Sequence, residues 1–148
     1  TVSPEALPYT TSDVPKNGGP RENIRLPNYS LNLVRKMKPT ASIRLMIHKD
    51  TYFESAVGDG QYDAFMKALW KIYERLGKDH PLLTDYMVSI PPGGKTDALV
   101  ETVITWDFKG QEFKTRGLDP DQTEAAIKAT IKMLNIIEND DFKFKDQK

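Results

Sequence analysis

Cysteine is absent from this chain of 148 residues, so neither a disulfide nor a cysteine-bound metal can stabilise its fold. A chain without cysteine suits a reducing compartment, and we expect a cytoplasmic protein. Histidine is scarce too: only His48 and His80 occur, and no His-x-His or H-E-x-x-H segment is present. The sequence therefore predicts no metal site and no cofactor in this chain.

The chain also lacks an excess of charge of either sign. Its 21 lysines and arginines balance 21 aspartates and glutamates, so no overall field would attract nucleic acid or an anionic membrane. No apolar run approaches the roughly 20 residues that cross a bilayer. No G-x-S-x-G turn or Walker loop is present, and we expect no catalytic residue. The start at Thr1 has no initiator methionine and no secretion signal, which suits a piece of a longer protein.

What the sequence does contain is an internal repeat, and the repeat organises the rest of the prediction. The offset between like residues is 57 at the start of each copy and grows to 59 and then 61, with each increase at an expected turn, where insertions are tolerated. The matched pairs include Leu26 and Leu83, Tyr29 and Tyr86, Leu33 and Ile90, Ile43 and Val100, Gly58 and Gly117, and Ala64 and Ala125. We predict copies at 24–78 and 81–138, a linker or arm at 1–23 and a flexible tail at 139–148.

In each copy the spacing of apolar residues changes from every second residue, as in strands, to the 3.6-residue period of a helix. Alternation over 28–33, 41–47 and 51–57 predicts three strands in copy one, and 98–106 and 111–116 continue the pattern in copy two. Short turns are expected at Lys49-Asp50 and Lys109-Gly110. Apolar residues then recur at helical spacing from Tyr62 to Leu76, where Gly77 ends the helix, and again from Ala126 to Ile137. The predicted fold is α+β: two βββα units related by a pseudo-twofold, with helices packed on antiparallel sheets.

A glycine-marked turn precedes each predicted helix, at Val57-Gly58-Asp59-Gly60 and at Arg116-Gly117-Leu118-Asp119-Pro120. Glycine lets a ligand approach the backbone closely. The N-terminus of a helix presents unpaired N–H groups that suit a carboxylate. An equally simple interpretation is that the glycines make tight turns and that Asp59 and Asp119 cap the helices. The residues alone leave both interpretations open.

Two sets of motifs resemble the regulatory C-terminal domain of 2-isopropylmalate synthases, and citramalate synthases carry a similar domain. The first is Gly58-Asp59-Gly60-Gln61-Tyr62-Asp63-Ala64, followed by Lys67-Ala68. The second comprises Asp85-Tyr86, Gly94-Lys95-Thr96-Asp97-Ala98, and Gly117-Leu118-Asp119-Pro120-Asp121 with Glu124-Ala125. The resemblance covers roughly residues 24–138. It implies a homodimer, a catalytic barrel domain in the parent synthase, and feedback inhibition by leucine or another branched-chain amino acid.

The resemblance also implies where an effector binds, namely between the two units and close to the dimer interface. Carried onto this sequence, the effector-binding residues are Gly58, Gly60, Asp63, Leu83, Tyr86, Ile90, Ala98, Val100, Pro120 and Gln122. In this hypothesis backbone N–H groups near Gly60 or Pro120–Gln122 hold the carboxylate, and Asp63 offsets the ammonium. Apolar strand residues enclose the side chain. Simple core packing is the alternative role for Leu83 and Val100.

The leading hypothesis is thus an allosteric domain that senses leucine and is not itself catalytic, within an acyltransferase of leucine biosynthesis. One alternative is a dimerisation scaffold that binds no ligand, and another is the isoleucine-sensing domain of a citramalate synthase. A further alternative is a small enzyme with Asp63, Tyr86 and Glu124 as acid–base groups.

Overall fold

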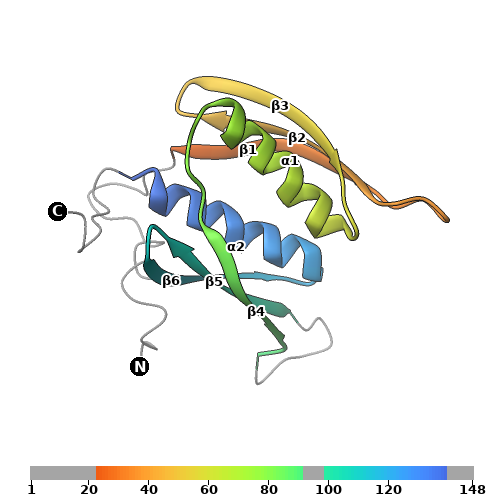
Figure 1. Ribbon diagram of the computed structural model, residues 1–148. Coiled ribbons are helices and arrows are strands. Elements are labelled where there is room, and N and C mark those ends of the chain that lie inside the picture. The colour runs from red at the N-terminus through yellow and green to blue at the C-terminus, as the bar shows by residue number, and fades with distance from the viewer. Residues whose placement is uncertain (1–22, 92–98, 140–148) are drawn as a thin grey trace. The chain divides into compact units, whose positions relative to one another are not determined.

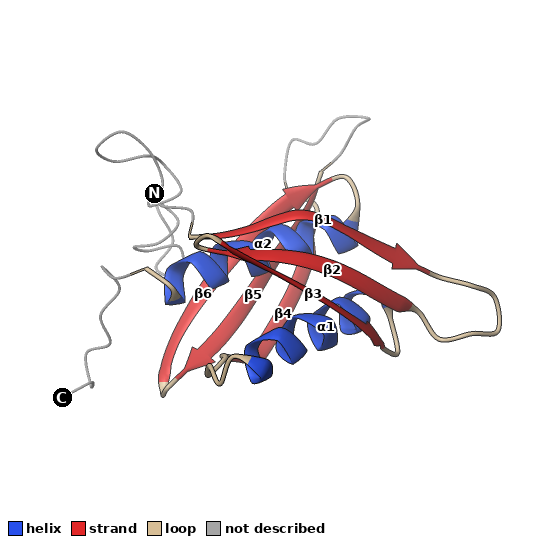
Figure 2. Cartoon of the chain, turned by 90° about the horizontal axis from the view of Figure 1, so that it is seen from above, coloured by secondary structure: helices blue, strands red, loops and turns tan. Residues whose placement is uncertain are grey.

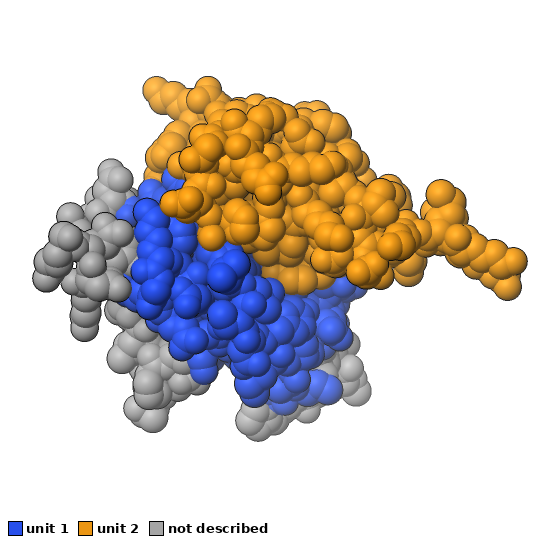
Figure 3. Space-filling model, in the orientation of Figure 1, with its two compact units in different colours: residues 1–22, 81–148 blue, residues 23–80 orange. Residues whose placement is uncertain are grey.

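The computed structural model describes residues 23–91 and 99–139. The chain divides into two compact units, one formed by residues 23–80 and the other containing the described residues from Pro81 onward (Figure 3). The predicted arm before residue 23, the predicted tail after residue 139 and the candidate Ala98 lie outside the described residues. Each unit is described by itself below.

The first unit has three antiparallel strands followed by a helix (Figure 1). Its strands are β1 (Ile24–Asn32), β2 (Thr40–Ile47) and β3 (Asp50–Val57), hydrogen-bonded in the order β1-β2-β3. The helix α1 (Gln61–Arg75) packs mainly on β2 and β3. Alternate residues of β2 are buried, which places one face of the sheet against the helix and confirms the expected period of two.

The second unit repeats this arrangement. Its strands are β4 (Leu82–Ser89), β5 (Val100–Phe108) and β6 (Gln111–Asp119), in the order β4-β5-β6, and α2 (Gln122–Ile137) packs on β5 and β6. Figure 2 shows each helix in blue beside the red strands of its sheet. The duplicated α+β units with helices on antiparallel sheets are therefore confirmed.

The structure corrects several predicted boundaries. The third strand of the second unit continues to Asp119 instead of ending at 116, so Gly117 lies within the ladder, opposite Thr102, and not in a turn. The first strand begins at Ile24 and passes a bulge, and Leu33 lies beyond its end with 68% of its surface exposed. The turn before β3 is formed by His48 and Lys49, one residue earlier than predicted.

Gly77 ends α1 as predicted. It adopts a φ of +67°, a conformation that favours glycine. Its N–H donates to the Glu74 carbonyl at 3.0 Å, and the N–H of Lys78 donates to the Tyr73 carbonyl at 2.9 Å. These two bonds are those of a Schellman motif, which satisfies the last carbonyl groups of a helix.

The matched glycines of the repeat serve the same packing role in both units. A Cβ built on Gly58 would overlap the backbone of Ala64 at the start of α1, and one on Gly117 would overlap the backbone of Ala125 in α2. Because Ala64 and Ala125 are themselves a matched pair of the repeat, the close approach of third strand to helix is duplicated together with the sequence.

Among residues 23–91 and 99–139, neither helix has the length and apolar character needed to cross a membrane.

Candidate functional site

The N-terminus of α1 has no side-chain cap. Its N-cap residue is Gly60, which has an extended backbone and makes no side-chain cap hydrogen bond. The alternative that Asp59 caps this helix is therefore wrong. Asp59 is an exposed carboxylate that forms an ion pair with Lys38 at 3.2 Å. The N-cap residue of α1 therefore supplies none of the side-chain acceptors that usually cap a helix.

Asp63 lies in the first turn of α1 and its carboxylate turns back toward the preceding loop. Its Oδ2 accepts a hydrogen bond from the N–H of Asp59 at 2.8 Å and lies 3.3 Å from the Nζ of Lys67. The hydrogen bond from Asp59 is the main reason that the pKa of Asp63 falls below its usual value. Burial opposes this fall, and Lys67 lowers the pKa further. Asp63 is therefore a carboxylate at neutral pH, and from the first turn of α1 it holds the preceding loop through the hydrogen bond from Asp59.

The N-terminus of α2 differs from that of α1. Asp121 is its N-cap residue, and its side chain accepts a hydrogen bond from the N–H of Glu124 at 3.1 Å. The predicted cap, Asp119, instead accepts from the N–H of Asp121 at 2.9 Å and forms an ion pair with Lys128. The hydrogen bond from Asp121 lowers the pKa of Asp119, and Lys128 adds to this effect. A carboxylate of the protein thus already occupies the N-terminus of α2.

The candidate residues of β4 lie on the face of the sheet that carries α2. In the register of the sheet, Leu83 is opposite Trp106 and Tyr86 is opposite Ile104, and both partners are buried. Leu83 is 41% exposed and Ile90, just after β4, is 65% exposed. These side chains therefore form an apolar surface that α2 does not bury.

Tyr86 links this surface to α2. Its phenol is half-buried, and burial raises its pKa above the usual value, while interactions with the side chains of Gln122 and Thr102 oppose the rise. The Thr102 hydroxyl itself is buried and forms no hydrogen bond with any residue that the structure describes. The phenol therefore lies beside the first turn of α2. Thr102 lies close enough to affect its pKa, but the two hydroxyls do not form a hydrogen bond of ordinary geometry.

The predicted site residues thus fall into two sets. Gly58, Gly60 and Asp63 lie together around the start of α1. In the second unit, one face of the sheet carries Leu83 and Tyr86 of β4 together with Val100 of β5, and Ile90 follows the end of β4. The start of α2 carries Pro120 and Gln122. Sequence reasoning missed Thr102. The signal that could have found it is its alignment in the repeat, where this polar residue matches the apolar Leu45 of the first unit.

We expect the phenol of Tyr86 to titrate above its ordinary value of 10.0. Since the fold favours the neutral phenol, the associated stability is complete below 10.0 and is lost as the pH rises through the raised pKa. NMR of carbon-13-labelled tyrosine, assigned with Tyr86→Phe, measures the midpoint. Gln122→Ala should raise the midpoint further, because it removes an interaction that lowers the pKa. A midpoint at or below 10.0 would contradict the burial of this group.

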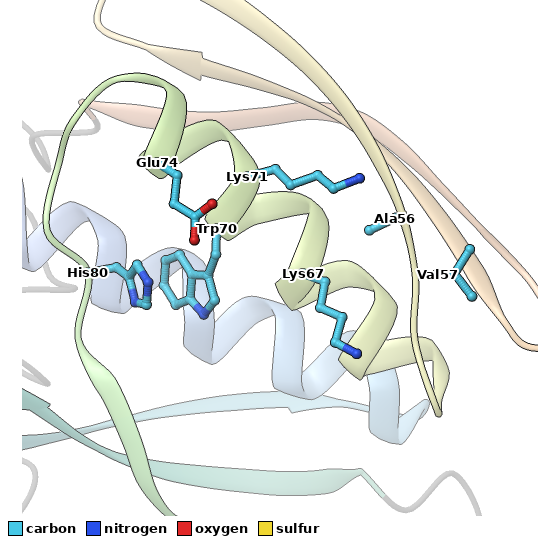
Figure 4. Close-up of a pocket in the computed structure, with 7 residues that line it drawn as sticks. All are labelled: Ala56, Val57, Lys67, Trp70, Lys71, Glu74 and His80. Atoms are coloured by element: carbon cyan, nitrogen blue, oxygen red, sulfur yellow. The ribbon is translucent and has the colours of Figure 1, made fainter.

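A cavity of about 460 Å³ lies elsewhere in the first unit, along α1 and the end of β3 (Figure 4). The rings of Trp70 and His80 stack at its side with centroids 4.0 Å apart. None of the predicted site residues lines it. Its lysines, Lys67 and Lys71, form a basic run with Arg75 along α1, in which Lys71 donates to the Ser55 carbonyl and Arg75 pairs with Glu54. The run therefore fastens α1 to β3.

Comparison with known proteins identifies the family. A family model described as the LeuA allosteric (dimerisation) domain matches residues 2–138. The chain belongs to this family. The match includes both βββα units and every residue of the two candidate sets. The resemblance that the motifs suggested is therefore confirmed.

Curated relatives of this LeuA domain are 2-isopropylmalate synthases. The protein of that name from Yersinia enterocolitica is 34% identical over 117 residues, which cover 78% of this chain and 21% of the relative. The one from Methanocaldococcus jannaschii is 32% identical over 114 residues, which cover 77% of this chain and 21% of the relative. The LeuA domain described here thus spans about a fifth of the length of these synthases.

Proposed function

We propose that this LeuA domain senses leucine as a feedback inhibitor of a 2-isopropylmalate synthase-like acyltransferase, of which it forms a non-catalytic, dimeric part. The observation that carries the proposal is the difference between the two helix N-termini. The start of α2 is capped by Asp121, whereas the matched start of α1 has no side-chain cap and follows a loop with two glycines. The repeat thus leaves the N-cap position of one helix without a side-chain acceptor.

The carboxylate of the effector would bind at the start of α1, near Gly60. The helix dipole favours an anion there by up to ~2 kcal/mol when the site is partly buried. Of the two positions that the sequence suggested for the carboxylate, the start of α2 is less favourable because the side chain of its N-cap residue, Asp121, already accepts a hydrogen bond from the N–H of Glu124.

The ammonium and the side chain of the effector would use the remaining candidates. Both described partners of Asp63 contact its Oδ2, and its charge would offset an ammonium group. The exposed apolar surface around Leu83, Tyr86 and Ile90 suits a branched aliphatic chain. Burial of an isobutyl group contributes about 2 kcal/mol. Each of these contacts suits one part of a zwitterion with an apolar side chain.

Feedback inhibition further requires that leucine bind one arrangement of a homodimer better than another. Coupling energies of this kind are about 1–3 kcal/mol. We expect the catalytic barrel of the parent synthase to respond to this shift, with no metal or cofactor bound in the LeuA domain itself.

Calorimetric titration tests the proposal. Leucine should bind in the micromolar to sub-millimolar range, and Asp63→Asn and Tyr86→Ala should each weaken binding by at least ~10-fold. The first removes the charge that would offset the ammonium group, and the second removes apolar surface that the aliphatic chain would cover. Asp59→Asn is the matched control: it neutralises a carboxylate of the same loop whose side chain is 82% exposed and outside the proposed site. This control should bind leucine as the unchanged chain does.

The same titration separates the alternatives. Tighter binding of isoleucine than of leucine would assign the domain to the citramalate synthase branch. No heat from leucine, isoleucine, valine or 2-oxo acids would leave a dimerisation scaffold without a ligand. Equal loss of binding in Asp59→Asn and Asp63→Asn would count against the assigned role of Asp63.

A further inference from the structure

Every described residue that lines the cavity along α1 and the end of β3 belongs to the first unit, and none is a proposed effector contact. Its volume of about 460 Å³ lies within the range of roughly 300–1,000 Å³ that is typical of small-molecule sites. Four lining residues follow one another at helical spacing along α1, namely Lys67, Trp70, Lys71 and Glu74. Residues three and four apart are neighbours on a helix surface, so cationic, aromatic and acidic groups gather on one side of α1.

The aromatic end of the cavity is fixed from two directions. The indole of Trp70 stacks on the imidazole of His80, with centroids 4.0 Å apart and an angle of 8° between the planes. It also meets the ring of Tyr73, which is fully buried, at 81° with centroids 5.6 Å apart. Trp70 itself is partly exposed, and its matched residue in the repeat is Ile131. The first unit therefore has an aromatic wall at a position where the second unit has an aliphatic side chain.

The opposite end of the cavity is cationic. Figure 4 shows the side chains of Lys67 and Lys71 extending from α1 toward the end of β3, away from the two rings. The Nζ of Lys71 donates to the Ser55 carbonyl at 2.7 Å, and the Nζ of Lys67 lies 3.3 Å from Oδ2 of Asp63. An ammonium group carries three N–H donors, so a lysine held by one such contact keeps donors for a ligand. Two ammonium groups at one end of a cavity suit a carboxylate.

The remaining lining residues limit the kind of anion that fits. Glu74 lies at the aromatic end, where Figure 4 shows its carboxylate next to Trp70. A carboxylate there repels a second negative group at that end of a ligand. Ala56, which is buried, adds a small apolar residue at the end of β3. The cavity thus favours a ligand with one negative charge and an otherwise apolar body.

We infer that this cavity is a second binding site, for a small organic anion that carries one carboxylate and an apolar body such as a ring. The carboxylate binds the ammonium groups of Lys67 and Lys71, and the body lies against the indole of Trp70. Because contacts within the first unit already hold both ends, binding requires little further ordering of side chains. The site is separate from the position proposed above for leucine, and it does not depend on leucine binding.

Calorimetric titration of the whole chain with phenylacetate, and with the uncharged phenylacetamide, tests the inference. Phenylacetate should bind at least ~5-fold more tightly, because two ammonium groups each add an ion pair. Trp70→Ile installs the matched residue of the second unit and should weaken phenylacetate binding by at least ~5-fold, since it removes the aromatic contact. Lys71→Gln should weaken binding to a similar extent. Lys132→Gln, at the matched position of α2, is the control and should bind phenylacetate as the unchanged chain does.

Fluorescence locates the bound probe. The chain has two tryptophans, and the other one, Trp106, is fully buried in the second unit. Phenylacetate should therefore change the emission of the unchanged chain but not that of Trp70→Ile. Circular dichroism confirms that each variant is folded.

The inference is wrong if the unchanged chain shows no saturable binding of phenylacetate, or if Trp70→Ile and Lys71→Gln both bind it as tightly as the control does. Equal affinities for phenylacetate and phenylacetamide would show that the lysines do not recognise an anion. Leucine should not displace phenylacetate, and complete displacement would place the probe in the effector site instead. A chain that binds phenylacetate as expected but not leucine would contradict only the proposed sensing of leucine.

Discussion

Gly117→Ala should lower the free energy of unfolding by about 3 kcal/mol, the upper part of the usual range for overpacking. An added Cβ would overlap the carbonyl oxygen of Ala125 and lie 2.8 Å from the backbone nitrogen of Ala129. Both are backbone atoms of α2, so no side chain can rotate to make room. The helix must move away from β6, and the close packing between them is lost. Urea denaturation followed by circular dichroism measures the change.

Gly60→Ala is the matched control for this substitution. A Cβ at Gly60 would meet nothing within 4 Å, and the residue is the N-cap of α1, where alanine is less favourable than glycine. We expect a loss below about 1 kcal/mol. Gly58→Ala should resemble Gly117→Ala, because its Cβ would overlap the backbone of Ala64. Similar losses in Gly60→Ala and Gly117→Ala would show that flexibility, and not close packing, explains the glycines.

Much of this fold could be predicted because the sequence contains two copies of the same βββα unit. A strand pattern that is ambiguous in one copy is resolved by the other, as when Gly58 and Gly117 align just before the two helices. The end of β6 could not be predicted in this way. Its ladder continues through Gly117 to Asp119, since Val100 of β5 supplies a partner there, and glycine within a strand reads locally as a turn.

The position of Tyr86 was predictable from the repeat, which aligns it with Tyr29 on the first strand of the other copy, but the neighbours of its phenol were not. The structure brings the phenol to Gln122 at the start of α2. The capping residues could not be assigned by position alone. Asp119 and Asp121 are both suitable N-cap residues, and the choice between them depends on where β6 ends. Thr102 was missed because burial of a lone hydroxyl depends on packing between distant segments.

Thr115→Val should cost about 2–3 kcal/mol of stability, because it breaks a buried chain of hydrogen bonds without changing the volume of the side chain. The indole N–H of Trp106 donates to the Thr115 hydroxyl at 2.9 Å, and this hydroxyl donates to the Ala129 carbonyl at 2.8 Å. Trp106 is fully buried. Valine would leave its N–H without an acceptor in a place that water does not reach, and the desolvation cost would be paid in full.

Thr102→Val makes the same substitution on the same face of the same sheet, with the opposite expectation. The Thr102 hydroxyl is buried and meets hydrogen-bond geometry with no described residue, so its removal relieves a desolvation cost. We expect a change within about 0.5 kcal/mol, or a gain in stability. Chemical denaturation of both variants under one set of conditions gives the difference. Equal losses would mean that valine disturbs this sheet through its shape alone, and that the bonds from Trp106 and to Ala129 contribute little to the fold.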